Sequence, residues 1–356
     1  MFSTPRLLLV LSVLALALAA CQPATSQPPV SVTEQPTAVS TETPIQGELV
    51  VYSGRAEALI QPVIDAFQAK YPQVKVLLKS GSNSALANAL IEEQANPQAD
   101  VFITTEVFTI QSLAQKGIFQ SYLPKGAENL PNDLIGPGQT WIGLTRRARV
   151  IMYNADLVKP EELPSSIFDL TDPKWKGQIA AAGSTNGSMQ AQIAVMRQLL
   201  GDEVTTEWLK GLIANEVTFF GSHTDVRKAV GAGEFKLGLV NHYYYHLQKA
   251  EGSNVGVIYP DQGEGQIGLI TNATAAAIVK GSDNLAAAQA FLDFLISPEG
   301  QKLFAEANYE YPILPGVALR EGVLPLENFR LAKVDLLAAT ADLDATFRLI
   351  EAVGLP

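Results

Sequence analysis

The chain has 356 residues, of which 47% are hydrophobic, with a formal net charge of −11 and a single cysteine. This composition supplies enough apolar sequence for one large or two modest folded lobes. The acidic balance and the lack of a basic run exclude nucleic acid as a partner. A single cysteine excludes an intramolecular disulfide and a thiolate metal site.

The N-terminal residues have the composition of an export signal. Residues 7–20 are almost wholly apolar, a length that suits a signal sequence and is short for a membrane span. They lead into Leu18–Cys21, which resembles a bacterial lipobox. We predict a signal peptide over residues 1–20 and lipidation of Cys21, which would anchor the protein to a membrane. An ordinary signal peptide cut after Ala20 is the alternative.

The segment after the cysteine is rich in Pro, Thr, Ser and Gln and has no helical or strand periodicity. Such composition is typical of a flexible linker. We therefore predict that residues 21–47 tether the folded part to the membrane surface.

From Glu48 onward, short apolar strands alternate with helical patterns, first over 48–104 and again over 178–240. This alternation is typical of parallel α/β sheets, and its repetition predicts two lobes. Ligands of such folds bind beyond the carboxyl ends of strands and between lobes. The predicted strands are 48–53, 74–78, 99–104, 178–182, 217–220 and 237–240; the predicted helices are 58–67, 84–93, 189–200, 225–232, 287–295 and 299–307.

Three consecutive tyrosines, Tyr243–Tyr245, follow the last predicted strand and are flanked by His242 and His246. At a strand end, or in the first turn of a helix, two adjacent phenols can converge on one target. A phenolate is a hard anionic ligand, and tyrosine binds iron in catalase. The cluster therefore suggests a ferric site. A tyrosine-rich interface, a sugar-stacking platform and a zinc site on the two histidines are the alternatives.

These residues also carry a family resemblance over nearly all of the chain that follows the tether. The chain resembles the periplasmic ferric-iron-binding proteins of ABC importers, which are bacterial transferrin-like solute-binding proteins. The segments that match in order are Val50–Arg55, Ala99–Phe102, Arg147–Val150 with Tyr153 and Asn154, Pro173–Gly177, Trp208–Leu212, Gly233–Glu234 leading to Val240–Tyr244, and Glu310–Pro312.

The resemblance implies a two-lobed, type II-like periplasmic-binding-protein fold with a hinge and a ligand cleft between the lobes. By analogy, the first lobe holds residues 48–149 plus about 274–324. The second lobe holds about 150–273 plus 325–356. The resemblance also implies a non-catalytic monomer that binds ferric iron (Fe3+) and delivers it to an inner-membrane permease. We therefore expect it in the periplasm, or lipid-anchored on the outer face of the cytoplasmic membrane.

The resemblance places the family's ferric ligands at Tyr243 and Tyr244, with Tyr245 as a packing residue. Tyr153 is a candidate third ligand, and a core position is the alternative. The first-lobe histidine of several members is absent, because Ala56 and Glu57 stand there. Glu57 is a candidate replacement or simply a first-turn acid.

Glu106 is another candidate metal ligand, one residue beyond the position where some members place a carboxylate. The missing first-lobe ligands imply that an exogenous anion, carbonate or phosphate, completes the metal's coordination. Residues that match the anion loops of relatives are Asn186, Gly187, Ser188 and Asn241, and Arg55 could add a bidentate fork.

Two simpler roles stay open for the candidate anion residues. Asn186 and Ser188 suit a helix cap, and Arg55 could pair with an acid. A binding protein for another small solute, such as a polyamine, a phosphonate or an oxyanion, is the functional alternative. The sequence has no Gly-x-Ser-x-Gly elbow, no His-Glu-x-x-His and no phosphate-binding loop of the nucleotide-hydrolase type, so we predict that it is not an enzyme.

Overall fold

The structure, a computed structural model, describes residues 44–356, without the side chains of residues 336 and 337. The predicted signal peptide, the lipidation at Cys21 and most of the predicted tether lie outside the described residues. No helix within residues 44–356 is long and apolar enough to cross a membrane.

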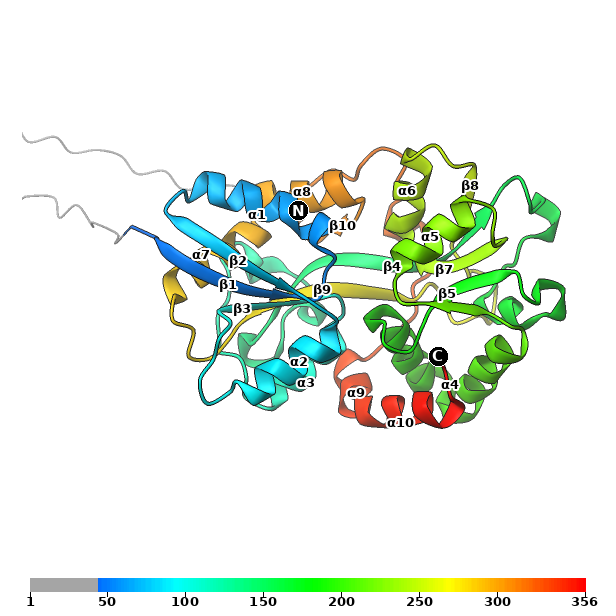
Figure 1. The fold of residues 1–356 in the computed structure, drawn as a ribbon, viewed down its shortest axis with the longest axis horizontal. Helices are drawn as coiled ribbons and strands as arrows, with labels where there is room; N and C mark the ends of the chain where they lie inside the picture. Colours follow the sequence, from blue (N-terminus) through cyan, green and yellow to red (C-terminus); the bar gives the residue numbers. More distant parts are fainter. Residues whose placement is uncertain (1–43) are drawn as a thin grey trace, which may run out of the picture. The chain divides into compact units, whose positions relative to one another are not determined.

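The predicted α/β alternation is confirmed over the whole described part of the chain (Figure 1). The strands are β1 (Gly47–Ser53), β2 (Val74–Ser80), β3 (Val101–Thr104), β4 (Ile142–Asn154), β5 (Ile179–Ala182), β6 (Thr218–Phe220), β7 (Leu237–Asn241), β8 (Val255–Ile258), β9 (Thr271–Ile278) and β10 (Tyr311–Pro312). The helices are α1 (Glu57–Lys70), α2 (Asn83–Glu92), α3 (Val107–Gln115), α4 (Gly187–Ala214), α5 (His223–Gly231), α6 (His242–Ala250), α7 (Leu285–Ile296), α8 (Pro298–Asn308), α9 (Leu336–Ala341) and α10 (Leu343–Val353).

One long strand, β4, joins two half-sheets. Its residues up to Ala148 pair with β9, and its residues from Arg149 onward pair with β7. The first half-sheet runs β2-β1-β3-β9-β4, and the second runs β4-β7-β5-β6 with β8 also on β4. In Figure 1, β4 and β9 cross from the α1, α7 and α8 side of the molecule to the α5 and α6 side.

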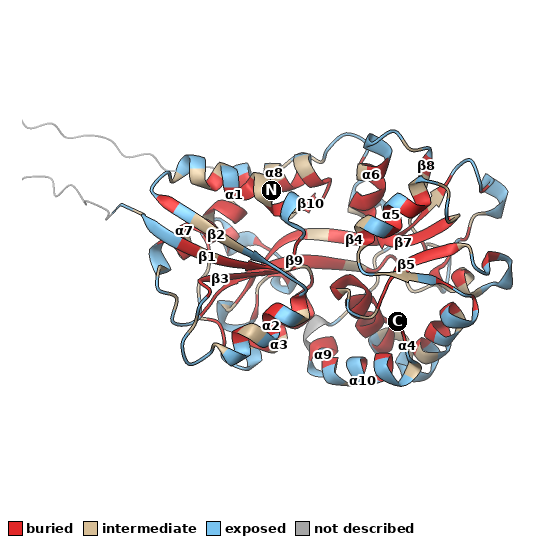
Figure 2. Cartoon of the chain, in the orientation of Figure 1, coloured by how far each residue is buried: buried red, intermediate tan, exposed pale blue. Residues whose placement is uncertain are grey.

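The sheet is mixed and not purely parallel as the alternation suggested: β1 pairs in parallel with β2 and β3, and β5 with β6 and β7, whereas all pairings of β4 and β9 are antiparallel. Each half-sheet is nevertheless covered by helices on both faces, as is usual for sheets that contain parallel strands. β3 is buried at all four positions, and the strands of both halves are mostly red in Figure 2 while the outer helix faces are blue. The helices cover the sheet with apolar stripes. In α1 the stripe consists of Ile60, Val63, Ile64 and Phe67, which are spaced three and four residues apart and are all buried.

Helix α4 is longer than predicted and contains a break. The expected helix over 189–200 continues to Ala214, with a non-helical Gly201 at φ +81° inside it. Glycine adopts this conformation without the steric cost that a Cβ would add. Helix α10 packs on α4, where Arg197 Nη2 donates to Asp342 Oδ2 at 2.8 Å, and α9 packs against both α3 and α4.

A buried ion pair holds the end of β1 to the chain segment before β10. Arg55 donates to Glu310 through Nη1 and Nη2, at 3.0 and 2.7 Å, and both side chains are almost fully buried. The Glu310 carboxylate also accepts from Thr145 of β4 at 3.2 Å. Segments that lie 255 residues apart in the sequence are therefore joined at one point.

We predict that Glu310→Gln lowers the free energy of unfolding by about 3–5 kcal/mol, because it leaves the buried Arg55 guanidinium without its counter-charge. Urea unfolding followed by circular dichroism measures this change. Glu306→Gln is the matched control, since Glu306 belongs to an exposed i,i+4 pair with Lys302. Its effect should stay within about 0.5 kcal/mol. Equal effects of the two substitutions would contradict the role given to the buried pair.

Candidate functional site

Two tyrosines converge at the junction between β7 and α6. Strand β7 ends at Asn241 and α6 begins at His242, so Tyr243 and Tyr244 occupy the first turn of the helix. Their ring centroids lie 4.3 Å apart, and the side chains are 3% and 9% exposed. Both line a cavity of about 270 Å³.

The cavity lies where the beginnings of several helices meet. The residues that precede α1, α2, α4 and α5 all line it: Ala56, Ser82, Asn186 and Ser222. Each helix start presents backbone N–H groups without an intrahelical partner and a partial positive charge. The remaining lining residues are Gly54, Arg55, Leu59, Gly81, Asn83, Thr105, Arg147, Thr185, Gly187, Ser188, Gly221, His223, Thr224, Tyr243 and Tyr244.

Charge in the cavity comes from arginines. Arg55 and Arg147 line it, and none of the described lining residues is an aspartate or glutamate. Arg55 is neutralised by Glu310, as described above. Arg147 is 1% exposed, and its Nε and Nη2 have no hydrogen-bond partner in the described part of the chain.

A third arginine, Arg149, does not line the cavity but hydrogen-bonds to residues close to it. Its Nε donates to Gln192 at 2.8 Å and its Nη1 donates to Asn241 at 3.2 Å. Burial and the neighbouring Arg147 lower the pKa of Arg149 to about 9, which still leaves it charged at neutral pH. Burial, Arg149 and Arg147 together hold the pKa of His223 well below its usual range, so this imidazole is neutral.

The tautomer of His223 follows from its contact with Arg149. Arg149 Nη1 lies 3.0 Å from His223 Nε2. A guanidinium nitrogen can only donate, so Nε2 accepts and the ring proton sits on Nδ1. His223 lines the cavity with a neutral ring that has a donor to offer.

Tyr244 is a phenol, not a phenolate, at neutral pH. Burial above all, then the neighbouring Tyr243, raises the pKa of Tyr244 well above its usual value, while Arg147 and Arg55 act in the opposite direction. A metal that binds through this oxygen must displace a proton.

The predicted anion residues divide into two groups. Asn186, Gly187 and Ser188 line the cavity at the start of α4, where Asn186 Oδ1 also caps the helix by accepting from Ser188 N at 3.0 Å. Asn241 does not line it, because its Oδ1 accepts from Arg149 and its Nδ2 donates to Ser188 at 3.1 Å. Arg55 lines the cavity and pairs with an acid, the simpler role left open above.

Tyr153 lies away from the cavity, contrary to its candidacy as a metal ligand. It shares strand β4 and face parity with Arg147, but six residues of strand separate them, a distance of about 20 Å. Its ring covers Gly256 of β8, where an added Cβ would collide with it. The structure places Tyr153 in the packing position that the sequence left open as the alternative to a metal ligand.

Neither candidate carboxylate lines the cavity. Glu57 is exposed as the first residue of α1, a first-turn acid. Glu106 is buried as the cap of α3, where its carboxylate accepts from the backbone of Phe108 at 2.6 Å and of Thr109 at 3.0 Å. Burial raises the pKa of Glu106 although these hydrogen bonds oppose the shift. Helix capping occupies the oxygens that we expected to face a metal.

The residues around the tyrosine pair hold α6 in place. Tyr245 is buried outside the cavity and accepts from Lys249 Nζ at 3.1 Å. His242 uses both ring nitrogens: Nδ1 accepts from Ala148 N at 3.2 Å, and Nε2 donates to the Tyr309 carbonyl at 2.9 Å. The zinc alternative has no support here, since residues 44–356 contain no cluster of three or more His, Cys, Asp or Glu suited to a metal.

Sequence reasoning missed Arg147 and His223 as site residues. Arg147 was noted only as part of a matching segment. The usable signal was the Arg-x-Arg spacing in an otherwise apolar strand, because alternate residues share one face and buried arginines need partners. His223 gave no such signal, since its position depends on how α5 meets β4.

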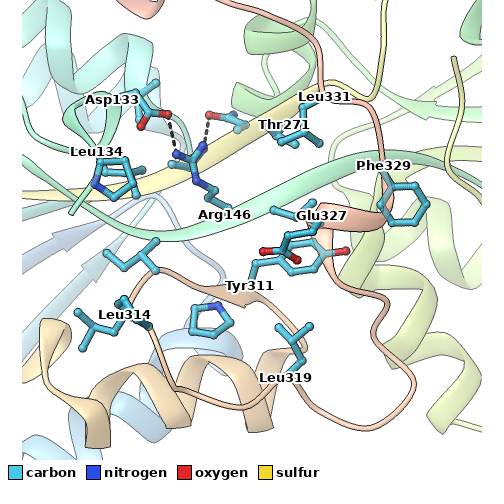
Figure 3. A pocket seen from close by; sticks show the side chains of 18 of the residues that line it. Asp133, Leu134, Arg146, Thr271, Tyr311, Leu314, Leu319, Glu327, Phe329 and Leu331 are labelled. Carbon is cyan, nitrogen blue, oxygen red and sulfur yellow. Dashed lines mark hydrogen bonds and ion pairs between the residues drawn. The ribbon is translucent and has the colours of Figure 1, made fainter. Parts of the chain in front are cut away.

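A second, larger cavity of about 830 Å³ lies beside the crossover strands and contains none of the predicted metal or anion residues. Figure 3 shows Arg146 of β4 in it, with Nη2 donating to Asp133 at 2.6 Å. Arg146 and Arg147 are adjacent, so strand alternation sends one to each cavity.

The chain belongs to a family described as bacterial extracellular solute-binding proteins, whose model matches residues 96–337. Members of this family are solute-binding proteins and not enzymes. Among its relatives, "Iron uptake protein A1" of Synechocystis is 37% identical over 83% of this chain and 84% of that protein. "Major ferric iron-binding protein" of Neisseria meningitidis serogroup B is 28% identical over 89% and 96%.

Solved structures agree with this assignment. Iron-bound HitA from Pseudomonas aeruginosa superposes with a TM-score of 0.80 at 29% identity, covering 86% of this chain and 99% of that one. FutA from Trichodesmium, in complex with iron and citrate, gives 0.70 at 32% identity with the same coverage. The predicted two-lobed periplasmic-binding-protein fold and the predicted family are confirmed.

We predict that Gly187→Ala disfavours the close approach of the two half-sheets by about 1–3 kcal/mol, the usual cost of overpacking. A Cβ at Gly187, at the start of α4, would collide with Asn83 Nδ2 and stand 3.2 Å from Thr105 Oγ1, both beside the first half-sheet. Small-angle X-ray scattering should show a larger radius of gyration than for the wild type. Gly221→Ala is the control, because a Cβ there meets nothing within 4 Å. An unchanged Gly187→Ala profile would refute the prediction.

Proposed function

We propose that this protein captures ferric iron outside the cytoplasm, with Tyr243 and Tyr244 as ligands, and delivers it to an inner-membrane ABC permease. The observation that carries the proposal is the convergence of two adjacent, buried phenols on one cavity between the half-sheets. Relatives named as iron-uptake and ferric iron-binding proteins support the same cargo.

An exogenous anion completes the metal's coordination in this proposal. Ala56 lines the cavity at the position where the family resemblance led us to expect a histidine, and neither Glu57 nor Glu106 lines it. Carbonate or phosphate would bind at Asn186, Gly187 and Ser188, where a helix start favours negative charge. The positive charge of Arg55 also attracts the anion, although its guanidinium is already paired with Glu310.

The cellular setting follows from the same proposal. The protein works as a monomer in the periplasm, or on the outer face of the cytoplasmic membrane when Cys21 is lipidated. Its two lobes, residues 48–149 with about 274–324 and about 150–273 with 325–356, close on the ligand by a hinge. In support, β4 changes pairing partner between Ala148 and Arg149.

A phosphonate or other oxyanion is the second candidate solute. The unpartnered Arg147 and the converging helix starts favour it. A relative named as a putative 2-aminoethylphosphonate-binding protein from Salmonella typhi is 26% identical over 71% of this chain. A polyamine has no such support, because none of the described lining residues is a carboxylate.

We predict that ferric salt added to the purified protein as a weak chelate produces a broad visible absorption band, from charge transfer between phenolate and iron. Tyr243→Phe combined with Tyr244→Phe should abolish the band. Tyr245→Phe is the matched control and should retain it, since Tyr245 does not line the cavity. Absorption titration measures all three. A band that survives the double substitution, or none in the wild type, would overturn the iron proposal.

We also predict that ferric affinity falls as pH falls. The raised pKa of Tyr244 keeps its proton on at neutral pH, so binding releases it, and acid favours the unbound phenol. Two phenol ligands imply release of about two protons per ferric ion. Calorimetric titration in buffers of different ionisation enthalpy counts the protons. Affinity that is constant between pH 6 and 8 would contradict phenolate ligation.

A further inference from the structure

His242 is held at two points by main-chain groups from distant parts of the chain. Its Nδ1 accepts from Ala148 N at 3.2 Å, and its Nε2 donates to the Tyr309 carbonyl at 2.9 Å. The side chain is 0% exposed, and its ring stacks on that of Tyr311, with centroids 4.3 Å apart and planes 20° from parallel. Because an N–H only donates and a carbonyl only accepts, a single tautomer satisfies both neighbours, with the ring proton on Nε2.

The contact with Ala148 fills a gap in the pairing of β4. Strand β10 pairs with β4 at Arg146, and β7 begins to pair with it at Arg149. Ala148 lies between these two pairings, and its buried N–H donates to the His242 side chain instead of to a strand. The imidazole therefore occupies the point of β4 at which the two half-sheets meet.

The contact with Tyr309 ties the same ring to the first half-sheet. Tyr309 ends α8 in the left-handed conformation, at φ 57°, and directly precedes Glu310, the partner of Arg55. The hydrogen bond from His242 to the Tyr309 carbonyl therefore connects the helix that carries the tyrosine pair to the buried ion pair at the end of β1.

The first turn of α6 lacks the usual side-chain cap. Asn241 stands at the N-cap position but makes no capping hydrogen bond, because its amide contacts Arg149 and Ser188 instead. A helix start without a cap leaves backbone N–H groups unsatisfied and is less firmly held. His242 is the first residue of the helix, so its two hydrogen bonds anchor this turn in place of a cap.

We propose that His242 is the positioning residue of the tyrosine pair. By bridging β4 and the turn after α8, it sets the direction in which the phenol oxygens of Tyr243 and Tyr244 enter the cavity. His242 does not line the cavity, so it acts through the two residues that follow it. The inference rests on the proposed function, because it takes these two oxygens as the ferric ligands. A tilt of this one helical turn would move both of them together.

His246 is the matched control on the same helix. It lies one turn further along, is 6% exposed and stacks on Tyr309 with ring centroids 5.1 Å apart, but its Nε2 has no hydrogen-bond partner in the described part of the chain. Phenylalanine retains an aromatic ring at either position and removes the nitrogens. Of His242→Phe and His246→Phe, only the first removes the bridge between Ala148 and Tyr309.

The test is absorption titration of the full-length protein with ferric salt as a weak chelate, carried out well below the melting temperature of each variant. We expect His242→Phe to weaken ferric binding by about 10- to 100-fold, the range for groups that orient metal ligands without touching the metal. The charge-transfer band should also shift, because its energy depends on the geometry between phenolate and iron. His246→Phe should change neither the affinity nor the band.

The band separates a positioning role from a merely structural one. A loss of stability alone lowers the melting temperature but does not move the band of the folded, iron-loaded protein. Wild-type affinity and an unmoved band in His242→Phe would overturn the proposal. An equal loss of affinity in His246→Phe would overturn it as well, since that residue does not form the bridge.

Two further variants cover the case in which His242→Phe fails to fold. The oxygen of an asparagine side chain lies near the position of a histidine Nδ1, and the amide nitrogen of a glutamine lies near that of Nε2. His242→Asn therefore keeps the acceptor for Ala148 N, and His242→Gln keeps the donor for the Tyr309 carbonyl. Each loses one hydrogen bond, so at least one should bind ferric iron less tightly than the wild type. Wild-type affinity in both would refute the positioning role.

An iron-free measurement keeps the two proposals separate. Nitrogen-15 NMR of the iron-stripped wild type at neutral pH should find the His242 ring proton on Nε2, and a proton on Nδ1 would overturn the bridge whether or not iron binds. A wild type that develops no absorption band with ferric salt overturns the ferric site itself. A wild-type band that His242→Phe leaves unchanged overturns only the positioning role.

Discussion

The hydrogen-bond ladder of β4 is the constraint on which the rest of the structure depends. A single strand of 13 residues pairs with β9 along its first part and with β7 and β8 along its second. Both half-sheets are therefore fixed to one backbone. Because side chains alternate along a strand, β4 also sends Arg146 and Arg147 to different cavities. The strand that connects the two half-sheets therefore also places the charge of Arg147 in the site.

The positive charge of the site comes from the arginines that β4 buries. Arg147 and Arg149 are both about 1% exposed, and neither faces a carboxylate within hydrogen-bonding distance in residues 44–356. The helix starts beside the cavity add partial positive charge to that of the arginines. Positive charge of this kind attracts anions, which is why the proposed function pairs the ferric ion with one.

The local pattern of the sequence predicted most elements and the tyrosine pair, because hydrophobic spacing and a strand-to-helix junction are local properties. It failed where side chains are recruited by partners distant in the sequence. Glu106 has the right chemistry for a metal but caps α3 with Phe108 and Thr109. Tyr153 of β4 packs over Gly256 and does not line the cavity. Spacing alone does not fix either outcome.

The sequence by itself determined the α/β alternation, the resemblance to solute-binding proteins and the position of Tyr243 and Tyr244 at a strand end. Tertiary structure decided which other groups meet them. Arg55 is held by Glu310, 255 residues away, whereas Arg147 is left unmatched beside the starts of α4 and α5. The reason is physical: hydrophobic periodicity is written in neighbouring residues, whereas the balance of a buried charge depends on every element that packs around it.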